Sequence, residues 1–310
     1  MSDSVFHGLR SILGADIVDA PKQETMYKSC VKDLTHAIHG RGFTLSKTLD
    51  DIEVDRTDIE SKIKNKYFDY IIYGVINSGI TVLYDYLELV HRTYPDDKIV
   101  YIDGADPKYV ISDLLGNGWY FKRELFEENP NMKPISFSVP KEKFQPFEEW
   151  QSKEYMIAPL VPGYMQTFIY DDETKYYEMY RKSLFGLTWK KAGWDCLRHY
   201  EIMMCGCIPL FVDIHHCPES ILTIYPKDLA KKALELPGLS LGFDPKQIFE
   251  YTNLRISNVD FSKIDFQTTE FNMLMMSALL DEMYSYAQKN LTTEVTAKYI
   301  LDTIQGNSSI

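Results

Sequence analysis

The sequence lacks a long apolar run, an excess of basic residues and any low-complexity tract. A membrane helix needs about 18 to 20 apolar residues, and no stretch approaches that length, so no integral membrane segment is expected. The 33 Lys and Arg residues are outnumbered by 45 Asp and Glu residues, giving a net charge of −12. Binding to a nucleic-acid backbone needs clustered cations, so no nucleic-acid partner is expected. A small anionic ligand is not excluded, because a few local cations suffice to hold it.

Cysteine is scarce as well, and the chain has an odd number of cysteines. Most of them fall in a segment expected to be buried, which is typical of reduced thiols, so we expect a cytoplasmic protein without disulfides. The first twenty residues are acidic and polar without an apolar core, unlike a signal peptide. The five cysteines are Cys30, Cys196, Cys205, Cys207 and Cys217.

The composition is that of a globular protein, with 45% hydrophobic, 14% aromatic and 25% charged residues. A chain of 310 residues favours two domains of about 150 residues each. Residues 129–162 carry six prolines, which disfavour a continuous helix or a central strand. We place the crossing near the end of this stretch and expect domains at residues 1–157 and 158–310.

The N-terminal half contains a strand–helix–strand pattern. The run FDYIIYG at residues 68–74 and the run KIVYIDG at residues 98–104 are typical of buried strands. Between them, residues 81–93 carry apolar side chains at helical spacing. Such a unit predicts a parallel, right-handed, Rossmann-like arrangement.

The C-terminal half repeats this pattern. We expect a helix at residues 173–182, a strand at 183–188, a helix at 195–205 and a strand at 208–212. Two further helices are expected at residues 269–289 and 292–304. The predicted fold class is therefore α/β, with two Rossmann-like domains built on parallel sheets.

The segment SLFGLTWKKAGWDCLRHYEIMMCGCIPLFVD, residues 183–213, is the most informative part of the chain. In an open parallel sheet, ligands bind beyond the carboxyl ends of the strands, where loops lead into helices. The loop WKKAGWD offers Lys190, Lys191 and Gly193, and we expect unpaired backbone amides and a positive helix end beside them. These features predict a diphosphate-binding corner.

Asp195, Arg198 and Glu201 follow at intervals of three on the expected helix. Arg198 is suited to paired hydrogen bonds with phosphate oxygens, and Glu201 to accepting hydrogen bonds from ribose hydroxyls. The alternative is a surface ion pair between these two residues, worth about 0.3 to 0.5 kcal/mol. We favour the nucleotide site because of the loop that precedes it.

Other residues of this segment have simpler interpretations. Gly206 is expected to end the helix, and His199 is expected to be structural rather than a catalytic base. A zinc site is the less favoured alternative, because two of its ligands would precede a buried strand and three would follow it. Those five residues are Cys205, Cys207, His215, His216 and Cys217.

The centre of this segment resembles the donor-binding region of the exostosin-like glycosyltransferases. The similarity extends over residues 158–229 and implies a GT-B fold, in which two Rossmann-like domains face a central cleft. The donor would bind to the C-terminal domain and the acceptor to the N-terminal domain. The residues that carry the resemblance are Arg198, Tyr200, Glu201, Gly206, Cys207, Ile208 and Pro209.

The resemblance implies a hexosyl- or pentosyltransferase that transfers a sugar from a nucleotide-diphosphate sugar to a glycan or another hydroxyl acceptor. Glu201 would bind the ribose, and Lys190, Lys191, Gly193, Asp195, Arg198 and Gly206 would contact the rest of the donor. Retaining GT-B enzymes carry a second glutamate eight residues before the first, where this chain has Gly193. An inverting mechanism is therefore expected. The sequence has no Asp-x-Asp motif, so we expect a site without metal and no cofactor beyond the donor.

An inverting transfer needs a general base. Asp103 and Asp106, in the sequence IDGADP after a predicted strand, are the candidates by position. Their alternative role is to build a turn or helix cap, and Lys122 and Arg123 are expected to be a solvated basic pair. Two other functions stay open: a non-catalytic nucleotide-sugar-binding module, and a DNA-base glycosyltransferase, which the acidic charge disfavours.

Overall fold

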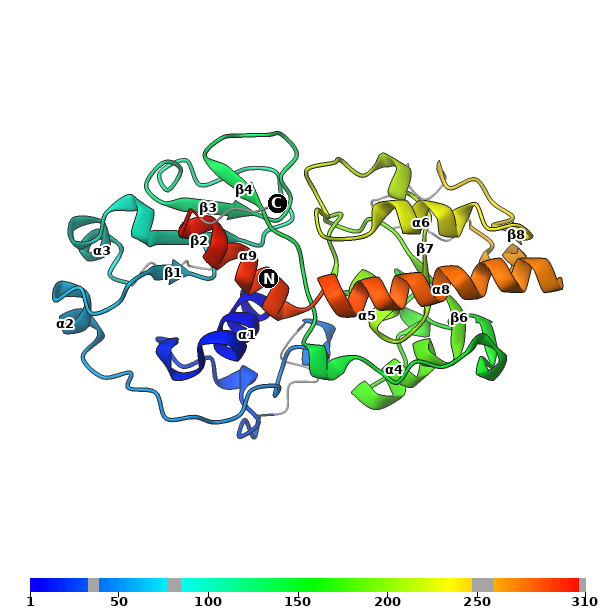
Figure 1. Ribbon diagram of the computed structural model, residues 1–310, viewed down its shortest axis with the longest axis horizontal. Helices are drawn as coiled ribbons and strands as arrows, with labels where there is room; N and C mark the ends of the chain where they lie inside the picture. Colours follow the sequence, from blue (N-terminus) through cyan, green and yellow to red (C-terminus); the bar gives the residue numbers. More distant parts are fainter. Residues whose placement is uncertain (33–38, 77–84, 247–258, 307–310) are drawn as a thin grey trace. The chain divides into compact units, whose positions relative to one another are not determined.

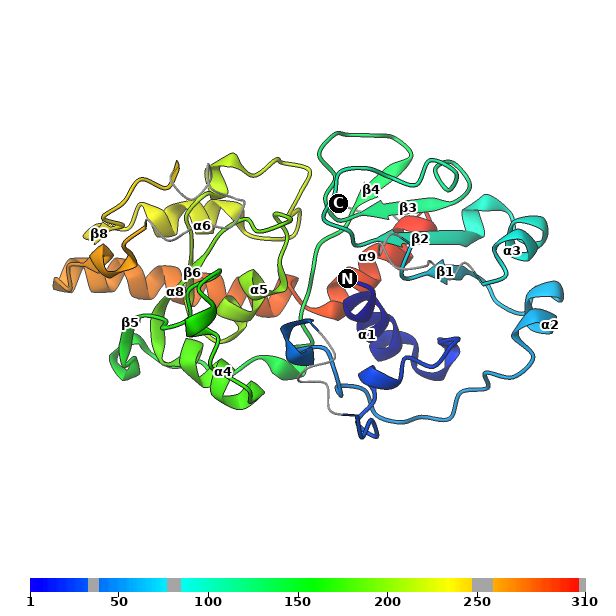
Figure 2. The ribbon, with the colours of Figure 1, turned by 180° about the vertical axis from the view of Figure 1, so that it is seen from behind.

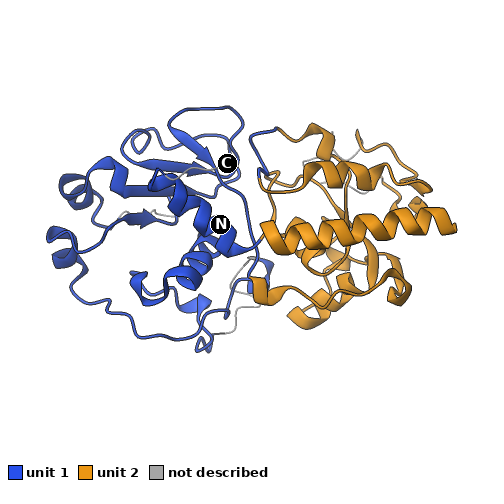
Figure 3. Ribbon diagram, viewed as in Figure 1, with its two compact units in different colours: residues 1–140, 219–223, 292–310 blue, residues 141–218, 224–291 orange. Residues whose placement is uncertain are grey.

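The computed structural model describes residues 1–32, 39–76, 85–246 and 259–306. The chain divides into two compact units (Figure 3). Unit 1 comprises Met1–Pro140, Glu219–Thr223 and Thr292–Ile310, and unit 2 comprises Lys141–Pro218 and Ile224–Leu291. Each unit contains a parallel β-sheet with helices packed against it. The α/β class with parallel sheets is thereby confirmed.

Unit 1 is built on a four-stranded sheet of order β1-β2-β3-β4, in which every pair is parallel. Its central strand β2 is buried along its whole length, as its continuous run of apolar residues predicts. β4 ends in Pro134, which is tolerated because this strand lies at the edge. The strands are β1 (Ile71–Tyr73), β2 (Ile99–Asp103), β3 (Trp119–Lys122) and β4 (Met132–Pro134).

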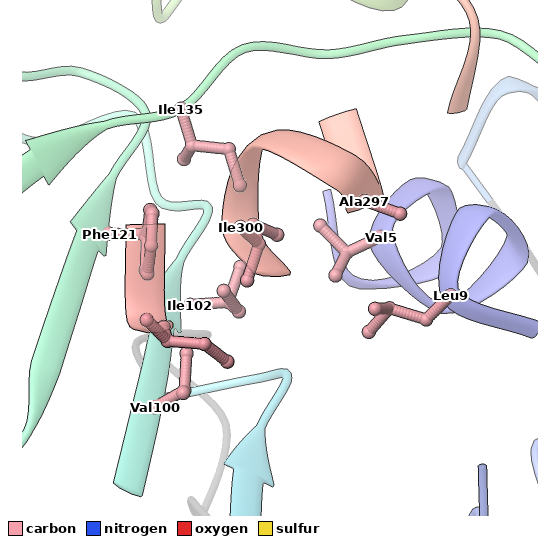
Figure 4. Packing of buried hydrophobic residues seen from close by; sticks show 9 residues of the cluster. Val5, Leu9, Val100, Ile102, Phe121, Ile135, Ala297 and Ile300 are labelled. Atoms are coloured by element: carbon pink, nitrogen blue, oxygen red, sulfur yellow. The ribbon is translucent and has the colours of Figure 1, made fainter. Parts of the chain in front are cut away.

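Helices cover both faces of this sheet. Successive side chains of a strand point to opposite faces, so the apolar residues of β2 need a partner layer on each side. Val100 and Ile102 of β2 pack with α1 (Ser2–Leu13) and α9 (Thr293–Ile304), as Figure 4 shows. Ile99 and Tyr101 pack on the other face, with Ile63 of α2 (Ile59–Lys64) and Val90 of α3 (Leu87–Thr93). The first and last helices of the described chain therefore form one layer.

Unit 2 is built on a three-stranded parallel sheet of order β5-β6-β7. The long helix α8 runs alongside α5 and α6 (Figures 1 and 2). Single turns of 3-10 helix occur in the loops of both units. The strands are β5 (Tyr155–Ile157), β6 (Ser183–Thr188) and β7 (Ile208–Phe211), with the short antiparallel pair β8 (Leu239–Ser240) and β9 (Asp265–Phe266). The helices are α4 (Glu173–Arg181), α5 (Leu197–Met204), α6 (Lys227–Leu234) and α8 (Glu270–Asn290).

Both predicted strand–helix–strand units are present with parallel strands. β6 has the predicted bounds, whereas β1 is three residues long and only half-buried. The helix predicted at residues 81–93 begins at Leu87, and residues 81–84 lie outside the described residues. The proline-rich stretch contains two strands, β4 and β5, and both are short edge strands.

The two units differ from the domains expected at residues 1–157 and 158–310. The first crossing follows Pro140, and α9 belongs to unit 1 rather than to the C-terminal unit. The physical reason is the apolar contact of α9 with α1 and β2, which the sequence separation of these elements conceals. Within the described ranges, no helix has both the length and the apolar character needed to cross a membrane.

The packing of α1 against α9 can be tested at Gly8. A Cβ atom at this position would overlap the backbone carbonyl of Thr293. Helix propensity alone favours Gly8→Ala by up to about 1 kcal/mol, whereas overpacking costs about 1 to 3 kcal/mol. We expect Gly8→Ala to lower the free energy of unfolding in urea. Ser11→Ala, at an exposed position of the same helix, is the control and should leave it nearly unchanged. A stabilised Gly8→Ala variant would contradict this packing.

Candidate functional site

The loop between β6 and α5, residues 189–196, lies at the carboxyl ends of the parallel strands of unit 2. This edge is where open parallel sheets bind ligands. The structure brings Lys190, Lys191 and Gly193 into the loop, and Arg198 and Glu201 onto the helix that follows. The predicted donor residues are therefore largely gathered at one corner, which we call the β6–α5 corner.

Arg198 lies in the first turn of α5. Its guanidinium carbon is 5.2 Å from the centre of the Phe168 ring. Its Nε atom is buried and has no hydrogen-bond partner among the described residues. A guanidinium stays charged at all ordinary pH values, and a buried donor without an acceptor costs about 1 to 3 kcal/mol or more when charged. The corner is thus suited to receive an acceptor from outside the protein.

Lys191 adds a second positive charge next to Arg198. Burial lowers the pKa of Lys191, and the charge of Arg198 lowers it further. The Lys191 ammonium is 5.9 Å from the Trp189 ring centre, and the Lys190 ammonium is 5.9 Å from that of Trp194. The cations of Lys191 and Arg198 repel each other, and the repulsion is stronger at a partly buried site than in water. An anion bound between them would stabilise both.

Glu201 is 6% exposed, so it is not the surface residue that the alternative assumed. Its Oε2 atom accepts a 2.6 Å hydrogen bond from the hydroxyl of Tyr176 on α4. Burial and the neighbouring carboxylate raise the pKa of Tyr176 well above its ordinary value. The phenol therefore stays protonated and fixes the orientation of Glu201.

Asp195 and His199 are structural parts of the corner. The helix begins at Leu197, so Asp195 lies in the loop rather than on the helix as expected. Its buried carboxylate accepts a 2.9 Å hydrogen bond from the Tyr200 hydroxyl. His199 is fully buried, donates from Nε2 to the Trp194 carbonyl and bonds Thr188 through Nδ1. With both ring nitrogens engaged, His199 is a positioning residue, as the sequence suggested.

The expected cradle of unpaired backbone amides needs correction. The Lys190 amide donates to both oxygens of the Asp213 carboxylate, at 3.2 and 3.1 Å. The Lys191 amide donates to the Gly193 carbonyl. These bonds shape the loop and leave its side chains, rather than these two amides, to meet a ligand. Asp213 was missed by the sequence analysis, although its place directly after a predicted strand was a usable signal.

Gly206 lies away from the other predicted donor residues. It follows α5 with a φ of 63°, and its amide donates to the Met203 carbonyl while the Cys207 amide donates to that of Ile202. These two bonds are a Schellman cap, which requires a left-handed residue. Gly206 precedes β7, whereas the β6–α5 corner lies at the strands' carboxyl ends. The prediction that it ends the helix is correct, but its position does not support its assignment to donor binding.

The residues of the alternative zinc site are divided in the same way. Cys205 and Cys207 precede β7, and residues 215–217 follow it. In the part of the chain that the structure describes, no three His, Cys, Asp or Glu side chains are grouped as metal ligands.

In unit 1, Asp103 is a structural residue rather than a base that meets a substrate. It is fully buried at the end of β2. One carboxylate oxygen accepts from the Tyr120 hydroxyl at 2.7 Å, and the other faces the Lys122 ammonium at 3.1 Å and the Ala105 amide at 3.0 Å. Both oxygens are therefore engaged within the protein, which corrects the assignment of Asp103 as a catalytic base.

Asp106 is accessible, with 45% of its side chain exposed, and it forms an ion pair with Arg123. Lys122 and Arg123 were expected to be solvated, but their side chains are only 1% and 4% exposed. Burial lowers the pKa of Lys122, and the charge of Asp103 opposes this shift. Lys122 and Arg123 are therefore buried residues that form ion pairs with Asp103 and Asp106 near the carboxyl ends of β2 and β3.

Comparison with known protein families, with curated proteins and with solved structures gives no match to this chain. The resemblance to the exostosin-like glycosyltransferases accordingly stays a prediction based on the residues quoted for it.

The burial of Asp213 makes a testable contribution to stability. Burial raises its pKa from 3.8 to about 6, against the lowering effect of the Lys190 amide. A carboxyl with a raised pKa in the folded state stabilises the protein when protonated, and this contribution is lost as the pH rises towards 6. At about 1.4 kcal/mol for each pKa unit, the loss is on the order of 3 kcal/mol.

We expect Asp213→Asn to abolish this pH dependence while keeping an oxygen that accepts from Lys190. In urea unfolding between pH 3.5 and 7.5, the variant should gain stability relative to the parent as the pH rises. Asp228→Asn, an exposed carboxylate on α6, is the control. A constant difference between Asp213→Asn and the parent across this range would contradict the raised pKa.

Proposed function

We propose that this chain is a glycosyltransferase that binds a nucleotide-diphosphate sugar at the β6–α5 corner. The observation that supports this most is that the cations of Lys191 and Arg198 are neighbours. The Nε atom of Arg198 has no partner among the described residues. A diphosphate carries the negative charge and the acceptor oxygens that such a pair lacks. The position at the carboxyl ends of β6 and β7 agrees with this ligand class.

Each residue of the corner has a defined part in this proposal. Arg198 donates forked hydrogen bonds to the phosphate oxygens, a geometry that a lysine does not reproduce. Lys191 supplies a second charge that neutralises the diphosphate as it leaves. A carboxylate accepts several hydrogen bonds at once, so Glu201 binds a ribose hydroxyl while it keeps its bond to Tyr176.

The proposed transfer is inverting and proceeds without a metal ion. The acceptor hydroxyl oxygen attacks the anomeric carbon, and the bond from that carbon to the diphosphate oxygen breaks with its electron pair. The nucleoside diphosphate leaves, and the hydroxyl proton passes to a general base. We assign this base to Asp106, because Asp103 is buried and engaged on both oxygens. The GT-B arrangement of two facing domains is part of the same proposal.

Ligand binding tests the donor site directly. We expect thermal stabilisation by UDP, GDP or CDP, since a ligand at a hundredfold its dissociation constant adds about 2.7 kcal/mol to stability. Arg198→Ala removes hydrogen bonds worth about 1.5 to 3 kcal/mol, so calorimetry should show an affinity about 10- to 100-fold lower. Arg198→Lys should restore part of it by keeping the charge.

The control is Arg92→Ala, an exposed position of unit 1, which should leave the affinity unchanged. Circular dichroism checks that each variant is folded. If none of the nucleotides stabilises the parent, or if a folded Arg198→Ala variant binds as tightly as the parent, the proposed donor site is wrong.

Catalysis is tested by the release of nucleoside diphosphate from a panel of nucleotide sugars. A transferase should hydrolyse its donor slowly without an acceptor, whereas a non-catalytic module would bind the donor and release nothing. The proposal predicts slow release from the nucleotide sugar whose nucleotide gives the largest stabilisation. Binding without any release would favour the module.

Asp106→Asn tests the general base. A positioned base contributes about 10²- to 10⁴-fold to rate, so the variant should lose at least a hundredfold in kcat while the donor dissociation constant stays the same. Asp113→Asn, an exposed carboxylate of the same unit, should keep full activity. A normal kcat for Asp106→Asn would assign the base elsewhere.

A further inference from the structure

Unit 1 contains a pocket of about 530 Å³ at the carboxyl ends of β1 and β2. This volume is within the range of small-molecule sites, about 300 to 1,000 Å³. The pocket lies between the loops that follow these two strands and the beginning of α1. The described residues that line it are Met1, Ser2, Asp3, Gly74, Val75, Ile76, Gly104, Ala105, Asp106, Pro107 and Tyr109.

One wall of the pocket depends on two glycines, one at the end of each strand. A Cβ atom at Gly74 would lie 2.6 Å from the Ser2 hydroxyl oxygen, and one at Gly104 would lie 2.5 Å from the Met1 Cβ. A side chain at either position would force Ser2 or Met1 to shift. The glycines therefore permit the first residues of the chain to approach the strand ends and to form one wall of the pocket.

Buried cations hold the loop after β2 in place. Arg123 donates from Nε to the Gly104 carbonyl at 2.9 Å, and Lys122 donates to the Ala105 carbonyl at 3.1 Å. Arg123 also binds the Asp106 carboxylate. These contacts fix the backbone and the carboxylate before any ligand arrives, which reduces the ordering cost of binding.

The lining selects a chemical class of ligand. It includes two acidic residues, Asp3 and Asp106, together with Ser2 and Tyr109, whose side chain is 58% exposed. Among the described lining residues there is no Lys, Arg or His. Carboxylates accept hydrogen bonds from hydroxyl groups and repel anions, while an exposed aromatic ring covers the apolar face of a sugar.

We propose that this pocket is a second ligand site, which binds an uncharged sugar and discriminates against phosphorylated or carboxylated sugars. The inference rests on the proposed function in one respect, because Asp106, the proposed general base, lines the pocket, so that the bound sugar would be the acceptor. Its test requires only reversible binding to unit 1, and it is independent of the β6–α5 corner in unit 2.

Methyl NMR of the full chain tests the site, with glucose, galactose and mannose as uncharged probes at up to 50 mM. At least one of them should shift the methyl signals of Val75, Ile76 and Ala105 in a saturable manner. Glucose 6-phosphate and glucuronate, the anionic counterparts, should bind at least tenfold more weakly. Val75→Trp places a large ring at a position 53% exposed in the parent, so it should fill the pocket and reduce the affinity at least tenfold.

The matched control is Val31→Trp, at a position 96% exposed and outside the pocket lining, which should bind like the parent. The inference is overturned if no uncharged probe shifts these signals, if the anionic sugars bind equally well, or if Val75→Trp binds like the parent. Nucleotide binding to the same samples reports on unit 2. Loss of one proposal is thereby distinguished from loss of the other.

Discussion

Within each unit, the structure near the carboxyl ends of the parallel strands depends on how buried charges are compensated. A buried charge is stable only when it is paired and hydrogen-bonded. In unit 1, Asp103 meets this requirement through Tyr120 and Lys122. In unit 2, Arg198 meets it only in part, because its Nε atom has no acceptor among the described residues. Together with the neighbouring Lys191, this incomplete hydrogen bonding makes the β6–α5 corner the candidate binding site.

The sequence was most informative where a single local rule decides the structure. The continuous apolar run of β2 predicted a buried strand, and this strand is buried throughout. β6 was predicted with the bounds that it has. Gly206 was predicted to end α5, and the structure shows a left-handed cap there. The hydrogen bonds of this cap are local, so the sequence alone was enough to predict it. The edge strands β4 and β5 were missed because prolines conceal short strands, although an edge position tolerates them.

The candidate site was less predictable, because its members meet through tertiary contacts. Position after a strand identified Asp103 and Asp106 equally well, yet only the packing of Tyr120 and Lys122 buries the first and leaves the second accessible. Likewise, the loop sequence did not reveal that Asp213 occupies the Lys190 amide. Spacing along a helix places side chains on a face, but it carries no information about partners that come from other elements.

The assembly of unit 1 from three separate stretches of chain has a consequence for biosynthesis. A ribosome releases α1 early, but the apolar side chains Val5 and Leu9 find their partners Ala297 and Ile300 only after all of unit 2 has been translated. Until then this face of the nascent sheet lacks α9, and exposed apolar surface of this kind favours aggregation. Unit 2 is complete once Leu291 has been translated, whereas unit 1 also needs α9, so unit 2 is able to fold first. A chaperone would therefore bind unit 1, whose first residues are translated earliest.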